Sequence, residues 1–416
     1  MDNFKNIFFF TKNNFFFLLL CIYPWALISG PFISDSIGII LSLYLVVKSI
    51  IQKNLTYYKN VYFIFFFLFC IFISLNSIFN AQNFISIKSS IFYIRFGFFA
   101  IAVHYILKIN YEKLNIFFYS LLLALLVLSV DSTFQKIFGF NIIGIEKHEL
   151  RISSLFGDEL ILGSFVIKIL PIILAFIVYL EKNIKLSKIL IILILSLIPI
   201  LLSAEKAAFV SIILFCTFIV FAFDYKIKIK IFLIFIIFSS IFSILSINKD
   251  TKSRLLKEYA QSIVVTKSIY TQVHISHFNT AYKMYLDKPI IGHGSKTFRL
   301  KCSDPKYIYD KFSCSTHPHN YYLQLLAETG LIGTFFITLF YLSLILILFK
   351  SINLKKMVIL NHNLPHSLLV CSLLITFLPI STSGNIFNNW VSSMNFFSIG
   401  TLLFFLENKL KVKKYD

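Results

Sequence analysis

The sequence predicts an all-α integral membrane protein with about 12 transmembrane helices, and three observations support this. The 416 residues are 58% hydrophobic and only 14% charged. Their apolar residues form runs of about twenty, the length that crosses the hydrocarbon core of a bilayer. One long polar segment interrupts these runs late in the chain. The composition excludes a soluble multidomain protein, a disordered chain and a small disulfide-rich scaffold.

Twelve stretches have the length and composition of a span, with boundaries good to a few residues. Prolines punctuate some of them, which membrane helices tolerate. The first stretch begins too late, and lacks the small-residue cleavage site, for a removable signal peptide. The stretches are 15–31, 35–51, 61–79, 91–107, 115–133, 159–181, 187–203, 207–223, 231–247, 331–349, 366–382 and 389–406.

The distribution of basic residues predicts the orientation. The formal net charge of +20 could suggest a nucleic-acid partner, but in a membrane protein Lys and Arg first report topology. With the N-terminus in the cytoplasm, 20 cations lie in cytoplasmic loops and tails, against five in the short outer loops. We therefore expect both termini in the cytoplasm, membrane lipids as surroundings and no nucleic acid.

The polar segment 248–330 is expected to be a large, partly helical periplasmic loop. It divides the chain into helices 1–9 (1–247), the loop itself (248–330), and helices 10–12 with a basic cytoplasmic tail (331–416). Helical periodicity over 252–268 and 272–286 favours an ordered outer domain over a disordered connection.

Two of the six cysteines, Cys302 and Cys314, fall in this loop. On the oxidising side of a membrane the pair could form a disulfide, and two free thiols are the alternative. Metal binding is not expected, since no C-x-x-C spacing is present.

Unusual polar residues gather near the outer ends of the spans. The 39 cations include only four arginines, Arg95, Arg151, Arg254 and Arg299, and all four fall on the outer side. Arginine offers a planar fork for carboxylate or phosphate oxygens, which favours an outer-leaflet anion, above all phosphate. The simpler alternative is that long side chains near helix ends reach the lipid headgroups.

The segment His317–Gly333, reading HPHNYYLQLLAETGLIG, is the most informative. His319 and Asn320 precede a short amphipathic helix, which Gly330 and Gly333 are expected to break before the tenth span. A histidine at the water–membrane boundary suits a general base. A lone histidine in such a place is more often a solvated loop residue.

The spacing His-Asn, nine residues, then Gly-x-x-Gly resembles the signature of the O-antigen ligase and O-antigen polymerase superfamily. Upstream, Pro289, Gly292, Gly294 and Phe298 are similar to a P-x-x-G-x-G-x-x-x-F stretch of that family. Arg151 with the residues after it, the turn Ser203–Lys206, and Arg254 are also similar to family segments. The resemblance covers about residues 90–345.

The resemblance implies a metal-independent, cofactor-free, inverting glycosyl transfer at the periplasmic face. The donor would be a glycan on undecaprenyl pyrophosphate, and the acceptor lipid A–core or another glycan. His319 would take the proton of the acceptor hydroxyl. The substrate would contact Arg151, Lys206, Arg254, Arg95 and Asn320. Lys206 stands where the family usually has Arg, so it keeps the charge and loses the bidentate geometry.

The residues themselves agree with this in part. The sequence has no G-x-x-x-x-G-K-[ST] loop and no D-x-D pair, so neither ATP nor a sugar nucleotide is indicated as the donor. A ligase is favoured over a polymerase. A transporter or flippase is less favoured. Such a protein would consist of two repeated halves and would have its ionisable residues near the bilayer midplane. A non-catalytic scaffold leaves the histidine motif unexplained.

Overall fold

The computed structural model describes residues 2–181, 184–353 and 358–412, which are mostly helical. Eight of its helices are long and apolar enough to cross a membrane, and three shorter apolar helices cover 14–29, 186–202 and 206–222. The chain is therefore a multi-pass membrane protein. The expected count of twelve spans stays a prediction.

Each expected span overlaps a helix of the described chain. The first six helices are α1 (Asp2–Ser29), α2 (Pro31–Ile51), α3 (Val61–Asn76, continued by a π-turn to Ala81), α4 (Phe84–Ile91), α5 (Arg95–Ile109) and α6 (Leu114–Phe138). They are followed by α7 (Leu162–Leu180), α8 (Leu186–Leu202), α9 (Lys206–Ala222) and α10 (Ile227–Ile247). The last three are α15 (Tyr321–Ser351), α16 (Leu364–Thr376) and α17 (Asn389–Val412).

Helix α16 is shorter than expected. It ends at Thr376, so the last six residues of the stretch 366–382 are not helical. Pro379 lies in this part, and a proline ring disfavours helical backbone in the residue before it. The irregular segment 377–388 that follows becomes part of the polar site described below.

The core lies between helices that are distant in sequence. Helix α17 packs on α5, and α7 packs on both α8 and α16. Helix α7 is largely enclosed, with every side chain from Ile169 to Ile177 buried, so it lies in the interior of the bundle. Beyond the helices, the described residues form one two-stranded sheet, in which β1 (Ile352–Asn353) pairs antiparallel with β2 (Val358–Ile359).

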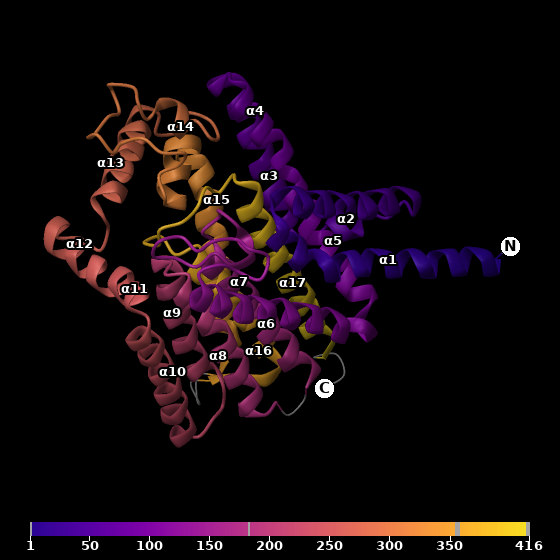
Figure 1. The fold of residues 1–416 in the computed structure, drawn as a ribbon. Coiled ribbons are helices and arrows are strands. Elements are labelled where there is room, and N and C mark those ends of the chain that lie inside the picture. The colour runs from indigo at the N-terminus through magenta and orange to yellow at the C-terminus, as the bar shows by residue number, and fades with distance from the viewer. Residues whose placement is uncertain (1, 182–183, 354–357, 413–416) are drawn as a thin grey trace.

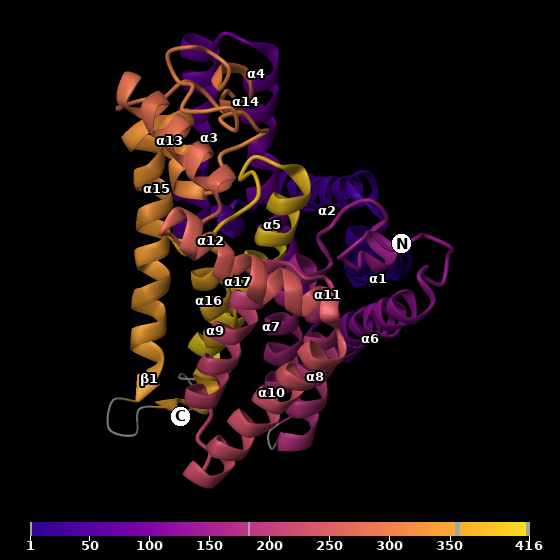
Figure 2. The same cartoon turned by 60° about the vertical axis from the view of Figure 1, so that its left-hand side comes forward.

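The polar segment after α10 is ordered and partly helical. It contains α11 (Lys249–Lys252), a π-turn to Lys257, α12 (Glu258–Thr266), α13 (Gln272–Asp287) and α14 (Phe298–Lys301). These helices match the two helical stretches expected at 252–268 and 272–286. In Figures 1 and 2, α13, α14 and α4 gather at one end of the molecule, which we call the loop end. Cys302 and Cys314 are joined there by a disulfide, with their Cα atoms 5.0 Å apart.

Candidate active site

The site is built where the connection after α13 docks on the start of α15. His293 and Gly294 donate backbone hydrogen bonds to the carbonyls of Ala327 and Glu328, at 3.1 and 2.7 Å. In return, Leu331 donates to the carbonyl of Pro289 at 2.8 Å. The two glycine-containing motifs of the sequence, 292–294 and 330–333, are therefore held against one another.

Two glycines permit this close approach. Gly330 is the one residue inside α15 with non-helical backbone, at φ 63° and ψ −162°, and it kinks the helix. A Cβ atom on Gly330 would collide with the backbone of Ile290, and one on Gly292 with the backbone of Glu328 and Thr329. Gly294 also lies at positive φ, against Ala81 and Ser86.

The expectation that Gly333 breaks the helix is wrong. Helix α15 runs through it without interruption, since only Gly330 departs from helical geometry. A Cβ atom on Gly333 would meet the side chain of Thr329 and, at 3.4 Å, the ring of Phe72. Its small size therefore serves close packing, a common use of glycine in membrane helices.

A buried carboxylate locks this junction. Glu328, which is fully buried, accepts hydrogen bonds from the backbone of Lys296 and Phe298, at 2.9 and 3.0 Å, and from Gln324 Nε2 at 3.0 Å. Gln324 in turn bonds Asn385 in the segment before α17. A buried carboxylate that lost these donors would raise the free energy of the folded protein. These hydrogen bonds therefore fix the loop before α14 relative to α15.

His319 lies immediately before α15, in left-handed backbone at φ 59°. Its carbonyl accepts a hydrogen bond from Ser383 N at 2.9 Å, which ties it to the segment 377–388. Asn320 is buried and caps α15 by accepting from Leu323 N. Asn320 Nδ2 donates to the carbonyl of Pro379 at 2.6 Å, so its side chain is engaged within the protein and positions His319.

Three other histidines lie around His319 and form a cluster of four with it. The ring of His319 lies 4.1 Å from that of His317, 5.3 Å from that of His277 and 5.4 Å from that of His274, between ring centres. His274 and His277 belong to α13, so the cluster joins α13 to the start of α15. Within the described part of the chain, no group of three or more His, Cys, Asp or Glu side chains could hold a metal ion.

The surroundings keep His319 neutral. Burial, and after it the neighbouring imidazoles led by His317, lower the pKa of His319 from 6.5 to about 3. Burial also lowers the pKa of His317, to about 4, and that of His274 and His277. The unprotonated imidazole, the form that accepts a proton, is therefore present at neutral pH.

These shifts predict how the protein responds to acid. Below about pH 6.5 the unfolded chain binds more protons at His319 than the folded chain does, so stability should fall as the pH decreases from about 6.5 toward 3. The acid limb of kcat/KM should lie below about pH 5 for the same reason. Melting temperatures and transfer rates between pH 4.5 and 8 test this. An acid limb centred near pH 6.5, as for a solvated histidine, would contradict it.

The cationic group begins with Arg151. Its guanidinium donates to the carbonyls of Ser203 and Leu160, at 3.1 and 2.7 Å, and lies 3.8 Å from Glu205. Glu205 also accepts from the backbone of Gly163 at 2.7 Å, at the start of α7. Burial lowers the pKa of Arg151. The negative charge of Glu205 raises that pKa, and the positive charge of Arg254 lowers it.

Arg254 and Lys206 adjoin the same turn between α8 and α9. Arg254 Nε donates to the carbonyl of Ala204 at 3.2 Å. Lys206, the first residue of α9, lies close enough to His274 for its charge to contribute to the lowered pKa of that histidine. The structure therefore brings Arg151, Lys206 and Arg254 together beside the histidine cluster.

Arg95 lies apart from these cations. Its guanidinium forms an ion pair with Asp35 of α2 at 2.9 Å and covers the ring of Phe96. It also donates to the carbonyl of Phe92 at 3.2 Å. These contacts fix α2 against α5, and the expected contact of Arg95 with the substrate stays a prediction.

Sequence reasoning missed several residues of the site. His274 and His277 appeared as part of an ordinary polar helix, and only the fold brings them to His319. Glu328 had a recognisable signal, because an acidic residue directly before an apolar span is costly unless it is paired. Asp131 accepts hydrogen bonds from Ile142 N and Ser154 Oγ, which steadies the loop that carries Arg151.

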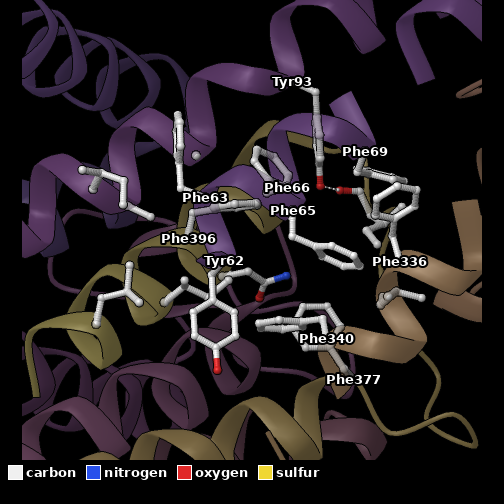
Figure 3. A pocket seen from close by; sticks show the side chains of 18 of the residues that line it. Tyr62, Phe63, Phe65, Phe66, Phe69, Tyr93, Phe336, Phe340, Phe377 and Phe396 are labelled. Carbon is white, nitrogen blue, oxygen red and sulfur yellow. Dashed lines mark hydrogen bonds between the residues drawn. The ribbon is translucent and has the colours of Figure 1, made fainter. Parts of the chain in front are cut away.

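An apolar cavity lies between the helices (Figure 3). Its volume is about 120 Å³, and aromatic rings from α3 and α15 form much of its wall. Tyr93 at one side donates to the carbonyl of Ile386 at 2.9 Å. Asn395 in the lining accepts a hydrogen bond from Lys168 Nζ at 2.8 Å, so the deep lysine of α7 is satisfied within the protein. The labelled rings of Figure 3 are Tyr62, Phe63, Phe65, Phe66, Phe69, Tyr93, Phe336, Phe340, Phe377 and Phe396.

Fold and site together define a multi-pass membrane protein whose polar site, a histidine cluster beside grouped cations, lies at one end of the helix bundle. Residues 191–338 match the family model described as O-antigen ligase, which supports the resemblance to the O-antigen ligase superfamily. The matched region runs from α8 to α15 and includes Lys206, Arg254 and the histidine motif. A comparison with curated proteins gave no match.

Proposed function

We propose that the protein transfers a glycan from undecaprenyl pyrophosphate to an acceptor sugar at the periplasmic face of the bacterial inner membrane. The observation that carries this is the position of Arg151, Lys206 and Arg254 beside a neutral, motif-borne histidine. A pyrophosphate-linked donor requires cations for its leaving group and a base for the incoming hydroxyl, and this arrangement offers both.

The reaction is a single displacement. The acceptor hydroxyl oxygen attacks the anomeric carbon of the donor sugar, and its proton passes to the imidazole of His319. The bond between that carbon and the pyrophosphate oxygen breaks, and the electron pair leaves with the lipid pyrophosphate. Arg151, Lys206 and Arg254 stabilise the charge that develops on this leaving group. Direct displacement inverts the anomeric configuration and requires neither metal nor cofactor.

Donor binding would also activate the base. A pyrophosphate beside Lys206 places negative charge near His274 and His319, and nearby negative charge raises the pKa of an imidazole. His319 is a weak base in the empty protein, since its pKa is lowered to about 3. The bound donor would move that pKa toward neutrality, where general-base catalysis is most efficient.

The apolar cavity supports a lipid-linked substrate. Its aromatic lining suits a hydrocarbon chain, and it lies among the apolar helices. We infer that it takes part of the chain that anchors the donor. Asn395 links its wall to Lys168, which lies on the same helix that Glu205 caps.

The acceptor separates two versions of this function. A ligase transfers to lipid A–core, whereas a polymerase extends a second lipid-linked repeat, and we propose the ligase. A deletion strain of the native organism distinguishes them. We expect bare lipid A–core, with long polymer accumulating on its lipid carrier. Cores capped by single repeats would indicate the polymerase, and unchanged surface and secreted glycans would contradict both.

A further inference from the structure

A second cationic group, Lys296 and Arg299, flanks the histidine cluster. Lys296 lies in the loop between α13 and α14, and Arg299 is the second residue of α14. Neither side chain has a hydrogen bond or ion pair within the part of the chain that the structure describes. In contrast, Arg151 and Arg254 each bond a backbone carbonyl of the 203–204 turn.

Lys296 and Arg299 lie on either side of Phe298 in the chain, the Phe298 ring lies 6.4 Å from that of His277, and the His277 ring lies 5.3 Å from that of His319. Burial lowers the pKa of Lys296, and the charge of Arg299 is the next cause. Arg299 also contributes to the lowered pKa of His317, after burial. The nearest carboxylate, Glu328, is already engaged by two backbone N–H groups and Gln324.

Arg299 and Lys206 act on different histidines of the cluster. The charge of Arg299 lowers the pKa of His317, and the charge of Lys206 lowers the pKa of His274. The rings of both histidines contact the His319 ring. In Figure 2, α14, which carries Arg299, lies with α13 at the loop end, whereas α9, which begins at Lys206, lies within the helix bundle.

The scaffold that presents these cations is rigid. The backbone of Lys296 is held in left-handed geometry at φ 57° by its bond to Glu328. Ser295 beside it bonds Ser90 of α4 at 3.0 Å, and Gly294 is clamped to the carbonyl of Glu328. Two unpaired cations on a fixed loop, one of them partly buried, are suited to an anionic ligand.

We propose that Lys296 and Arg299 bind a phosphate group carried by the acceptor glycan, and so hold the acceptor hydroxyl toward His319. This rests on the proposed function, because it assigns the second substrate to a cationic group distinct from the one proposed for the donor pyrophosphate. The position of α14 at the tip of the loop end favours a phosphate on a sugar above the bilayer surface over a lipid headgroup.

Binding of phosphorylated core oligosaccharide to the full-length protein in nanodiscs tests this. We expect Lys296→Gln with Arg299→Gln to weaken binding by about tenfold or more, since charge-assisted hydrogen bonds are lost. Lys301→Gln with Lys311→Gln is the matched control, because it removes two cations of the same outer segment, and it should bind like the wild type. Dephosphorylated oligosaccharide should bind the wild type as weakly as the double variant does.

Several results would overturn the proposal. These are no binding by the wild type, equal binding before and after dephosphorylation, or equal losses in the double variant and its control. Binding of inorganic phosphate is measured separately. If the double variant loses binding of free phosphate but still binds the oligosaccharide, that result also counts against an acceptor site. His319→Asn should bind the oligosaccharide normally. If that variant still transfers glycan, the proposed function fails while the binding result stands.

Discussion

Replacing His319 by Asn is expected to reduce glycan transfer by about 100-fold to 10,000-fold, the usual effect of removing a general base. Asparagine is chosen because it tolerates left-handed backbone, which His319 adopts at φ 59°. The protein should therefore still fold, and its melting temperature near pH 7 should remain within a few degrees of the wild type. Transfer is measured with lipid-linked donor in membranes that contain equal amounts of each protein.

The matched control is His362→Gln. His362 is exposed and lies just before α16, outside the histidine cluster. It should transfer at the wild-type rate. Undiminished transfer by His319→Asn, with correct folding, would show that His319 is not the base. An equal loss in both variants would show that the assay reports expression or folding instead of catalysis.

Gly330→Ala is expected to have the largest effect on stability. A Cβ atom at this position would collide with the backbone of Ile290, which cannot move without breaking the bonds between the 289–294 segment and α15. Its backbone, at φ 63° and ψ −162°, also costs a non-glycine residue about 1–3 kcal/mol. We expect a large drop in melting temperature and loss of transfer, because the same junction positions His319.

Gly157→Ala separates strain from collision. Gly157 has comparable backbone, at φ 62° and ψ −128°, but a Cβ atom there would meet no atom within 4 Å. Gly330→Ala should be less stable than Gly157→Ala by about 1–3 kcal/mol, the usual cost of overpacking. Equal destabilisation of the two variants would mean that the contact between Gly330 and Ile290 contributes nothing.

The helices were predictable because their signal is local. Apolar runs of spanning length, such as 231–247 and 331–349, coincide with α10 and α15, and the periodicity at 272–286 coincides with α13. Boundaries were predicted less well where backbone geometry overrides composition. The stretch 366–382 loses its last turns, and Gly333 remains helical where a break was expected.

The site was only partly predictable, because its parts come together through tertiary contacts. The motif identified His319, and the polar outer turns identified Arg151, Lys206 and Arg254. Nothing local showed that Arg95 pairs with Asp35, which is 60 residues away in the chain. The meeting of His274 and His277 with His319 depends likewise on how α13 packs against α15, a contact that no sequence period reports.

The central claim is that one site transfers a glycan from a lipid pyrophosphate by direct displacement. Its most direct test is the stoichiometry of the reaction, with purified protein in nanodiscs, a defined undecaprenyl-pyrophosphate-linked glycan and lipid A–core, in the presence of EDTA. The account predicts one undecaprenyl pyrophosphate released for each glycan joined to the acceptor, with inverted anomeric configuration. Retained configuration, a requirement for added metal, or release without transfer would contradict it.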